Sequence, residues 1–355
     1  MRKIQILIVD DSSVVRKALS VEFGKEADMA IAGVAANGRI ALSMVEQVSP
    51  DVIILDVQMP EMDGLTFLRE LRAHLFHVPV IMLSTMTKKG ADTTFEALSL
   101  GAKDYVTKPE FQNGYGEALA TVCGELLAKI RVFCKHLLPP EGHLSKPPVM
   151  RPDTPNAVPG KIPEIVVIGV STGGPTALSQ VVPLLSENFP LPILIVQHMP
   201  ALFTKMLAER LAASSKIRVL EVQGGEVLSG GQVYLAQGGF HMTIERSAKG
   251  MVTCLTQTPP VNSCRPSVDV LFESVHALYG ARTLAVVMTG MGEDGKRGCE
   301  AITASGGFVI AQDEATSVVW GMPGAVVRAG LAGRILPLSE IAPALGIFCR
   351  KGALK

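Results

Sequence analysis

The sequence lacks the features that mark membrane and secreted proteins. In its 355 residues, no uninterrupted apolar segment reaches the ~18 residues that a membrane-spanning helix needs. The start, MRKIQILIVDD, contains no small-residue cleavage site of a secretory signal. We therefore expect a cytoplasmic protein without membrane insertion.

Cysteine pairs at close spacing are also missing. The six cysteines form no C-x-x-C motif, the spacing that indicates many zinc sites and redox motifs. We expect reduced, buried thiols, with neither a structural zinc nor a disulfide framework.

The chain has no excess of charge of either sign, since its formal net charge is +0. The balance is uneven along the sequence, because residues 1–125 hold 12 Lys and Arg against 17 Asp and Glu, and the remainder holds 21 against 16. No segment resembles a nucleic-acid-binding patch, so we expect no nucleic-acid partner. The acidic excess of the first part suits a cation site.

Apolar runs alternate with amphipathic, helix-like segments on both sides of a proline-rich stretch. Five such repeats fill residues 1–125 and predict a (βα)5 domain with a parallel sheet, because continuous apolar runs are typical of strands buried on both faces. Residues 139–163 contain eight of the 23 prolines, which favours an extended linker. The predicted divisions are a first domain at 1–125, a helix end with linker at 126–163, and a second domain at 164–350.

The same alternation resumes after the linker and predicts a doubly wound α/β domain with a mostly parallel sheet. Residues 232–245 and 251–257 have no helix between them. They predict an antiparallel hairpin appended to that sheet.

Acidic residues follow two strands of the first domain. Asp10 and Asp11 come after the first strand and Asp56 ends the third, so their side chains should meet at the carboxyl edge of the sheet. Carboxylates gathered in one cleft favour a hard cation such as Mg²⁺. Ser84 and Lys108 end the fourth and fifth strands and bring a hydroxyl and an ammonium to the same edge. A single aspartate there would more often cap a helix, but the set favours a phosphoryl site.

These residues, with DVQMPEMDG around Asp56 and Tyr105 before Lys108, resemble the receiver domain of two-component response regulators across residues 1–125. The resemblance implies that Asp56 accepts a phosphoryl group from a sensor histidine kinase. The family often has threonine where Ser84 stands, which keeps the hydroxyl. The other roles implied by the resemblance are Mg²⁺ binding by Asp10, Asp11, Asp56 and the backbone carbonyl of Gln58, and a switch made of Ser84, Tyr105 and Lys108.

The glycine-rich stretch IGVSTGGPTAL at residues 168–178 permits two interpretations. A dinucleotide fingerprint needs glycine where Ser171 stands, and no P-loop lysine follows, so a phosphate-binding turn is weakened. The same letters spell G-x-S-x-G, which fits a sharp turn that exposes a nucleophilic serine beside backbone N–H groups. A serine that only caps the following helix is a third interpretation.

A nucleophilic serine needs a base and, in most cases, an orienting carboxylate. His198 follows a buried strand, and His241 is a rival base in the predicted hairpin. Asp294 lies in a glycine-rich turn after another strand, with Asp269 and Asp313 as rivals. Spacing alone does not decide between these candidates.

Six separated motifs make residues 165–350 similar to the chemotaxis protein-glutamate methylesterase (CheB) family: GVSTGGPTAL, QHMP, YLA with HM, RPSVDVLFES, MTGMGEDG and GMPGAV. The resemblance implies that Ser171 is the nucleophile, His198 the general base and then acid, and Asp294 the orienting carboxylate. It suggests the N–H of Met291 as an oxyanion donor, and the turn geometry adds that of Thr172.

The resemblance also implies what the second domain acts on. The substrates would be methylated glutamates of chemoreceptors, together with specific glutamines that are deamidated, and the domain would need no cofactor. Because such a substrate is a helical surface, we expect a shallow cleft with flanking recognition residues. Asn262, Arg265 and Ser267 are the candidates for substrate contact. Gln237 stands where the family usually has proline, and we expect only local loop adjustment there.

Two other function classes remain open at this stage. A receiver-controlled nucleotide-binding protein would use the turn at 169–174 to hold a pyrophosphate. A non-enzymic regulator would bind DNA or a protein partner, although no basic segment of helix-turn-helix size supports the DNA version.

Overall fold

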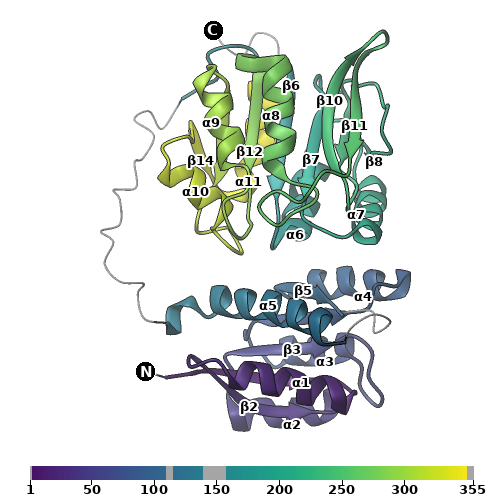
Figure 1. The fold of residues 1–355 in the computed structure, drawn as a ribbon, viewed down its shortest axis with the longest axis vertical. Helices are drawn as coiled ribbons and strands as arrows, with labels where there is room; N and C mark the ends of the chain where they lie inside the picture. Colours follow the sequence, from purple (N-terminus) through teal and green to yellow (C-terminus); the bar gives the residue numbers. More distant parts are fainter. Residues whose placement is uncertain (1, 109–114, 139–156, 350–355) are drawn as a thin grey trace. The chain divides into compact units, whose positions relative to one another are not determined.

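The structure is a computed structural model that describes residues 2–108, 115–138 and 157–349 (Figure 1). The chain divides into two compact units, Met1–Ser145 and Lys146–Lys355, and each is described by itself. Most of the predicted proline-rich linker, residues 139–156, lies outside the described residues. In the described part of the chain, no helix has the length and hydrophobicity needed to span a bilayer.

The N-terminal unit is built on a parallel five-stranded sheet in the order β2-β1-β3-β4-β5, which confirms the predicted receiver fold. Its strands are β1 (Ile4–Val9), β2 (Met29–Ala35), β3 (Val52–Asp56), β4 (Val80–Ser84) and β5 (Asp104–Thr107). Its helices are α1 (Ser13–Gly24), α2 (Gly38–Val48), α3 (Gly64–Ala73), α4 (Lys88–Ser99), α5 (Tyr115–Phe133) and the short 3₁₀ helix η1 (Lys135–Leu137).

Side-chain caps and apolar strands account for this arrangement. Helices α1 to α4 each begin after a residue whose side-chain oxygen accepts a backbone N–H of the first turn, and these caps are Ser12, Asn37, Asp63 and Thr87. Consecutive residues of β1, such as Ile6 and Leu7, are both fully buried although they face opposite sides of the sheet. Both faces of the sheet are therefore covered. The aspartates at the strand ends are not the helix caps, which leaves them for another role.

The C-terminal unit holds a seven-stranded sheet in the order β14-β13-β12-β6-β7-β9-β8, and every strand pair in it is parallel. Its strands are β6 (Ile165–Val170), β7 (Ile193–Gln197), β8 (Arg218–Glu221), β9 (Gln232–Leu235), β12 (Thr283–Val287), β13 (Phe308–Gln312) and β14 (Arg334–Leu336). The helices are α6 (Gly174–Val181), α7 (Ala201–Ser214), α8 (Val268–Tyr279), α9 (Lys296–Ala304), α10 (Met322–Arg328), α11 (Leu338–Phe348) and the short 3₁₀ helices η2 (Val182–Leu184) and η3 (Gly280–Arg282).

The predicted hairpin is present, but its limits differ from the prediction. Strands β10 (His241–Ser247) and β11 (Gly250–Thr256) pair antiparallel in a sheet of their own. Residues 232–235 were assigned to the hairpin from the sequence, whereas they form β9 and join the parallel sheet. The physical reason is that Val233, Tyr234 and Leu235 are fully buried, and a central parallel strand buries such a run on both faces.

Both sheets reverse their strand order beside the strand that comes first in the chain. In the N-terminal unit β1 lies between β2 and β3, and in the C-terminal unit β6 lies between β12 and β7. The crevice at the carboxyl ends of such strands is where open α/β sheets bind ligands. Each unit therefore offers one site at the edge where its polar motif residues occur.

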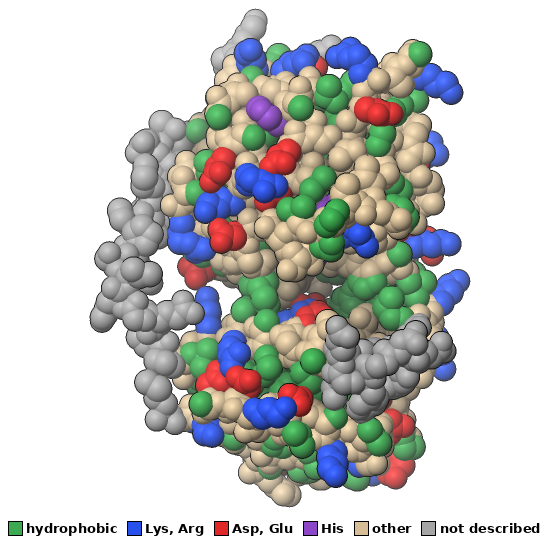
Figure 2. Space-filling model, viewed as in Figure 1, with side chains coloured by type: hydrophobic (Ala, Val, Ile, Leu, Met, Phe, Trp, Pro, Cys, Tyr) green, Lys and Arg blue, Asp and Glu red, His purple; other side chains and the backbone are tan. Residues whose placement is uncertain are grey.

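Charged side chains do not gather into a basic surface on the face that Figure 2 shows. Lys and Arg side chains are interspersed there with Asp and Glu.

Candidate active site and phosphoryl site

The polar residues predicted for the first domain meet at the carboxyl edge of its sheet. Asp10, Asp11 and Asp56 each bring one carboxylate oxygen within 4.8 Å of the others. Asp10 and Asp56 are buried, and Asp11 is exposed. Lys108 Nζ lies 2.7 Å from Asp10 Oδ2 and 2.8 Å from Asp56 Oδ2. Three oxygen donors with an excess of negative charge fit a hard cation such as Mg²⁺.

The Asp56 carboxylate is buried next to a second negative charge, that of Asp10. Burial raises the pKa of its carboxyl to about 6 against the opposing effect of Lys108, and the neighbouring charge of Asp10 adds to the rise. Its Oδ1 accepts the Val57 N–H at 2.7 Å. A buried carboxylate with few donors is stabilised by a group that neutralises its charge, which makes Asp56 the candidate reactive group of the cluster.

The predicted switch residues Ser84 and Tyr105 lie on β4 and β5, the two strands that follow β3 in the sheet. Ser84 is buried and its hydroxyl accepts a hydrogen bond from Thr94 Oγ1 at 2.7 Å. Tyr105 is buried, and Lys129 Nζ lies 5.7 Å from the centre of its ring. Gln58, the predicted source of a carbonyl ligand, is exposed two positions after Asp56.

Other segments of the protein pack closely against the two glycines of the turn after β6. Gly173 has φ 77° and faces Val318, and Gly174 packs against the Gln197 side chain, so a larger residue fits at neither position. Contacts with other segments of the protein therefore account for both glycines, without a bound phosphate. Helix α6 has Gly173 as its N-cap, without a capping side chain, so Ser171 is not the helix cap. The turn is one that presents a serine.

Ser171 lies beside His198 at the carboxyl edge, because each follows one of two paired strands. The His198 N–H donates to Val170 O at 3.2 Å, and Gln197 Nε2 donates to Ser171 O at 3.0 Å. The sequence analysis did not predict the contact between Gln197 and Ser171. The position of Gln197 at the end of β7, a buried strand, could have indicated it. The Ser171 hydroxyl has no hydrogen-bond partner among the described residues, His198 included.

His198 is paired with Asp294 and not with the rival carboxylates. Its Nε2 lies 2.8 Å from Asp294 Oδ2, and its Nδ1 lies 3.4 Å from Cys264 Sγ. Burial lowers the pKa of His198, but the bonds to Asp294 and Cys264 outweigh it and raise that pKa to about 9. An ionised carboxylate only accepts, so the neutral imidazole carries its hydrogen on Nε2 and leaves Nδ1 as the basic atom.

Asp294 is held by donors from three other segments. Besides His198, it accepts from Asn262 Nδ2 at 2.8 Å and from Ser267 Oγ at 2.8 Å. The N–H groups of Val268 and Asp269 donate to it at 2.7 and 3.1 Å. These two groups begin α8, so Asp294 caps that helix from a distant part of the chain. Burial would raise the pKa of Asp294, but the hydrogen bonds led by that of His198 lower it well below its usual range.

The rival candidates have other partners. His241 is buried, with Nε2 3.1 Å from Pro259 O and Nδ1 accepting the Ser267 N–H at 3.2 Å, so neither ring nitrogen is available as a base. Asp269 accepts from Gly298 N and Asn262 Nδ2. Asp313 accepts from the Thr316 N–H at 3.0 Å, which makes it a loop cap.

The predicted oxyanion donors are unengaged. Within the described residues, the backbone N–H groups of Thr172 and Met291 donate to no protein acceptor. Thr289 Oγ1 holds the turn by donating to Thr172 O at 2.9 Å. Free N–H groups beside a serine are what a developing oxyanion requires.

The residues predicted to contact substrate differ in their placement. The Asn262 and Ser267 side chains donate to Asp294, so the structure places them as supports of that carboxylate. Arg265 Nη1 donates to Thr258 O at 3.1 Å, and Arg265 lines an open cavity of about 430 Å³ together with His198 and Cys264. Of the three, Arg265 is the one that faces this cavity.

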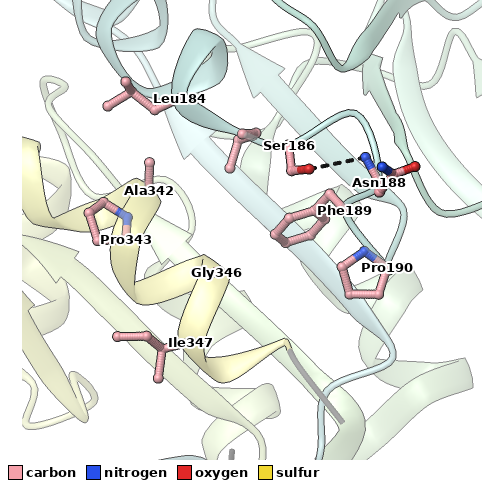
Figure 3. A pocket seen from close by; sticks show the side chains of 10 residues that line it. Leu184, Ser186, Asn188, Phe189, Pro190, Ala342, Pro343, Gly346 and Ile347 are labelled. Carbon is pink, nitrogen blue, oxygen red and sulfur yellow. Dashed lines mark hydrogen bonds between the residues drawn. The ribbon is translucent and has the colours of Figure 1, made fainter.

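A second cavity, of about 840 Å³, lies between the loop before β7 and helix α11 (Figure 3). Its walls are Leu184, Leu185, Ser186, Asn188, Phe189, Pro190, Ala342, Pro343, Gly346 and Ile347. None of these side chains is an acid or a base, and the hydroxyl of Ser186 accepts the Asn188 N–H at 3.2 Å, so this cavity has no base beside a nucleophile despite its larger volume.

Comparisons with known proteins identify relatives of both units. Residues 166–345 match the model of the CheB methylesterase family, and residues 6–118 match that of the response regulator receiver domain. A protein-glutamate methylesterase/protein-glutamine glutaminase of Trichodesmium erythraeum is 46% identical over 96% of this chain and 98% of its own length. One from a Nocardioides species is 44% identical over 97% of this chain and 94% of its own length.

A solved structure is also similar to the C-terminal unit. The crystal structure of the Thermotoga maritima CheB methylesterase catalytic domain covers 52% of this chain and 97% of that chain, with 42% identity and a TM-score of 0.51.

Proposed function

The chain belongs to the CheB methylesterase family, with a response-regulator receiver domain at its N-terminal side, and we propose that it hydrolyses methyl esters on glutamate side chains of chemoreceptors through Ser171, His198 and Asp294. The observation that carries the proposal is the His198–Asp294 pair, held at 2.8 Å on the same sheet edge as Ser171. The unengaged N–H groups of Thr172 and Met291 support it.

The reaction follows from the atoms at that edge. Ser171 Oγ attacks the ester carbonyl carbon while His198 Nδ1 takes the hydroxyl proton, and the negative oxygen accepts the N–H groups of Thr172 and Met291. His198 then returns the proton to the methoxy oxygen, the C–O bond breaks and methanol leaves. Water, deprotonated by the same nitrogen, hydrolyses the acyl-serine and leaves a free glutamate. With a glutamine substrate, ammonia leaves instead.

Asp294 serves this cycle by orienting the imidazole. Its bond to Nε2 directs Nδ1 away from the carboxylate and stabilises the imidazolium that forms. The serine–histidine bond is not made in the unliganded site. Catalytic hydrogen bonds are often long before substrate binds and tighten in the complex. In our proposal, the ester therefore brings the two side chains together.

The receiver domain controls the hydrolase in this proposal. Asp56 Oδ attacks the phosphorus of a phosphohistidine on a sensor histidine kinase, so a P–O bond forms and the P–N bond breaks. Asp10, Asp11 and Asp56 would hold Mg²⁺ with the carbonyl of Gln58. When bound, the ion neutralises charge on the phosphoryl oxygens. Lys108 then pairs with the phosphoryl group, and Ser84 and Tyr105 respond to it.

The test is release of labelled methanol from receptor membranes with and without a phosphodonor. Ser171→Ala should lower turnover by at least ~10⁴-fold and leave phosphorylation of Asp56 unchanged. Ser179→Ala is a matched control, because Ser179 lies on α6 and its hydroxyl donates to Pro175 O. Full turnover by Ser171→Ala would remove the proposed nucleophile.

A further inference from the structure

The basic nitrogen of His198 faces a thiol and not the proposed nucleophile. Nδ1 lies 3.4 Å from Cys264 Sγ, while the Ser171 hydroxyl has no hydrogen-bond partner in the described chain. Because Asp294 accepts the hydrogen on Nε2, the thiol S–H is the donor to Nδ1 when both groups are neutral. We propose that Cys264 is a positioning residue that occupies the basic nitrogen of His198 in the unliganded enzyme, so that Ser171 is activated only after the thiol is displaced. This inference rests on the proposed function.

The turn that carries Cys264 is tied to the same carboxylate. Asn262 and Ser263 have φ values of 51° and 61°, and two successive left-handed residues persist only where surrounding contacts hold them. The Val261 and Cys264 backbones exchange hydrogen bonds of 3.1 and 2.9 Å. Asn262 Nδ2 joins this turn to Asp294 at 2.8 Å. The thiol and the imidazole are therefore positioned from one fixed point.

Cys264 is also placed differently from the other cysteines. Cys123, Cys134, Cys299 and Cys349 are buried, and Cys254 and Cys264 are partly exposed. Of these two, Cys264 lines the cavity that contains His198. Burial, with a hydrogen bond to Glu245, raises the pKa of Cys254 to about 11. Cys254 lies on β11 and provides a matched control.

Several ionisable groups surround the imidazole. Asp294 and Cys264 contact it directly, and Arg265 lines the same cavity. Asp269 is one step further away, through Asn262, and Arg297 acts on both carboxylates from the start of α9. Asp294 accepts the hydrogen on Nε2, so the lone pair of the neutral imidazole is on Nδ1. Removing the thiol should therefore free Nδ1 for the Ser171 hydroxyl.

The experiment compares the pH dependence of kcat/KM for methanol release, with the phosphodonor held constant, in the full chain and its variants. In the unaltered chain kcat/KM should rise with pH as His198 loses its proton. Cys264→Ala should raise kcat/KM by up to ~10-fold on the plateau above this rise, where His198 is neutral, because Nδ1 no longer accepts the thiol hydrogen. Cys264→Ser keeps a small donor and should give an intermediate profile. Cys254→Ala should leave the profile unchanged.

The outcomes separate this inference from the proposed function. If Cys264→Ala follows the unaltered profile while Ser171→Ala is inactive, the positioning role is wrong and the proposed function stands. If Cys264→Ala is inactive and Ser171→Ala retains turnover, the thiol is itself the nucleophile, and both proposals are overturned. Thermal unfolding of each variant identifies loss of activity through misfolding, in which case Cys264→Ser supplies the comparison of profiles.

Discussion

Asp56 in the N-terminal unit and Asp294 in the C-terminal unit are both buried aspartates at the carboxyl edge of a parallel sheet. Asp56 shares its surroundings with Asp10 and has the Val57 N–H and Lys108 as partners, and its pKa is raised to about 6. Asp294 accepts hydrogen bonds from five groups, and its pKa is lowered. Burial alone therefore does not determine what a carboxylate does. The hydrogen-bond donors directed at it decide whether its pKa is raised or lowered, and so how readily it stays ionised.

The largest loss of activity should follow from removing the charge of Asp294. Asp294→Asn keeps the shape of the side chain but loses the charge that holds the hydrogen on Nε2 of His198, and we expect kcat to fall by ~10⁴-fold. Methanol release measures this. Asp313→Asn, which changes a loop-capping aspartate, should retain activity. If Asp294→Asn retained activity, the role of Asp294 would be limited to capping α8.

Removing the charge of Asp56 should leave hydrolysis in the absence of a phosphodonor unchanged. Asp56→Asn should abolish the response to a phosphodonor and stabilise the N-terminal unit at pH 7 by up to about 3 kcal/mol, because a buried carboxylate with a raised pKa no longer has to ionise. Phosphorylation assays and denaturant unfolding measure the two effects. Asp63→Asn, at the cap of α3, should respond normally to the phosphodonor. A destabilised Asp56→Asn variant would contradict our account of this carboxylate.

Removing one donor from Asp294 tests whether the number of donors matters. Ser267→Ala should lower kcat by about tenfold, the cost of one hydrogen bond to a charged group. Ser274→Ala is the control, because Ser274 lies on the same helix and contacts Ile244. Equal kcat values for the two variants would mean that Ser267 does not support the carboxylate.

The smallest effect is an opposite response of the two units to pH. The raised pKa of Asp56 means that its unit gains stability as pH falls through about 6. The lowered pKa of Asp294 means that its contribution is present above the ordinary value of 3.8 and is lost below it. Hydrogen exchange of peptides from the full chain, corrected for the pH dependence of the chemical exchange rate, gives the free energy of opening of each unit. That free energy should be larger at pH 5 than at pH 7 for the N-terminal unit, and a smaller value at pH 5 would count against the raised pKa.

Much of the fold was readable from the sequence because local patterns specify it. Apolar runs predicted the parallel strands of both units, and the turn residues predicted where most of them end. The exception is the segment at 232–235. The sequence predicts it as part of the hairpin because no helix separates it from residues 251–257. A short apolar strand pairs equally well in parallel or antiparallel, and its burial beside β7 decided the matter.

The sequence by itself determined which polar residues follow strands, and so placed Ser171, His198 and Asp294 on one edge and Asp10, Asp56 and Lys108 on another. Only the tertiary structure decided which of these side chains bond to each other. In the folded chain His198 pairs with Asp294, and both ring nitrogens of His241 have other partners. The Asn262 and Ser267 side chains donate to the Asp294 carboxylate, and Cys264 contacts Nδ1 of His198. The reason is that strand ends are set by local periodicity, whereas hydrogen-bond partners depend on where loops distant in the chain meet after packing.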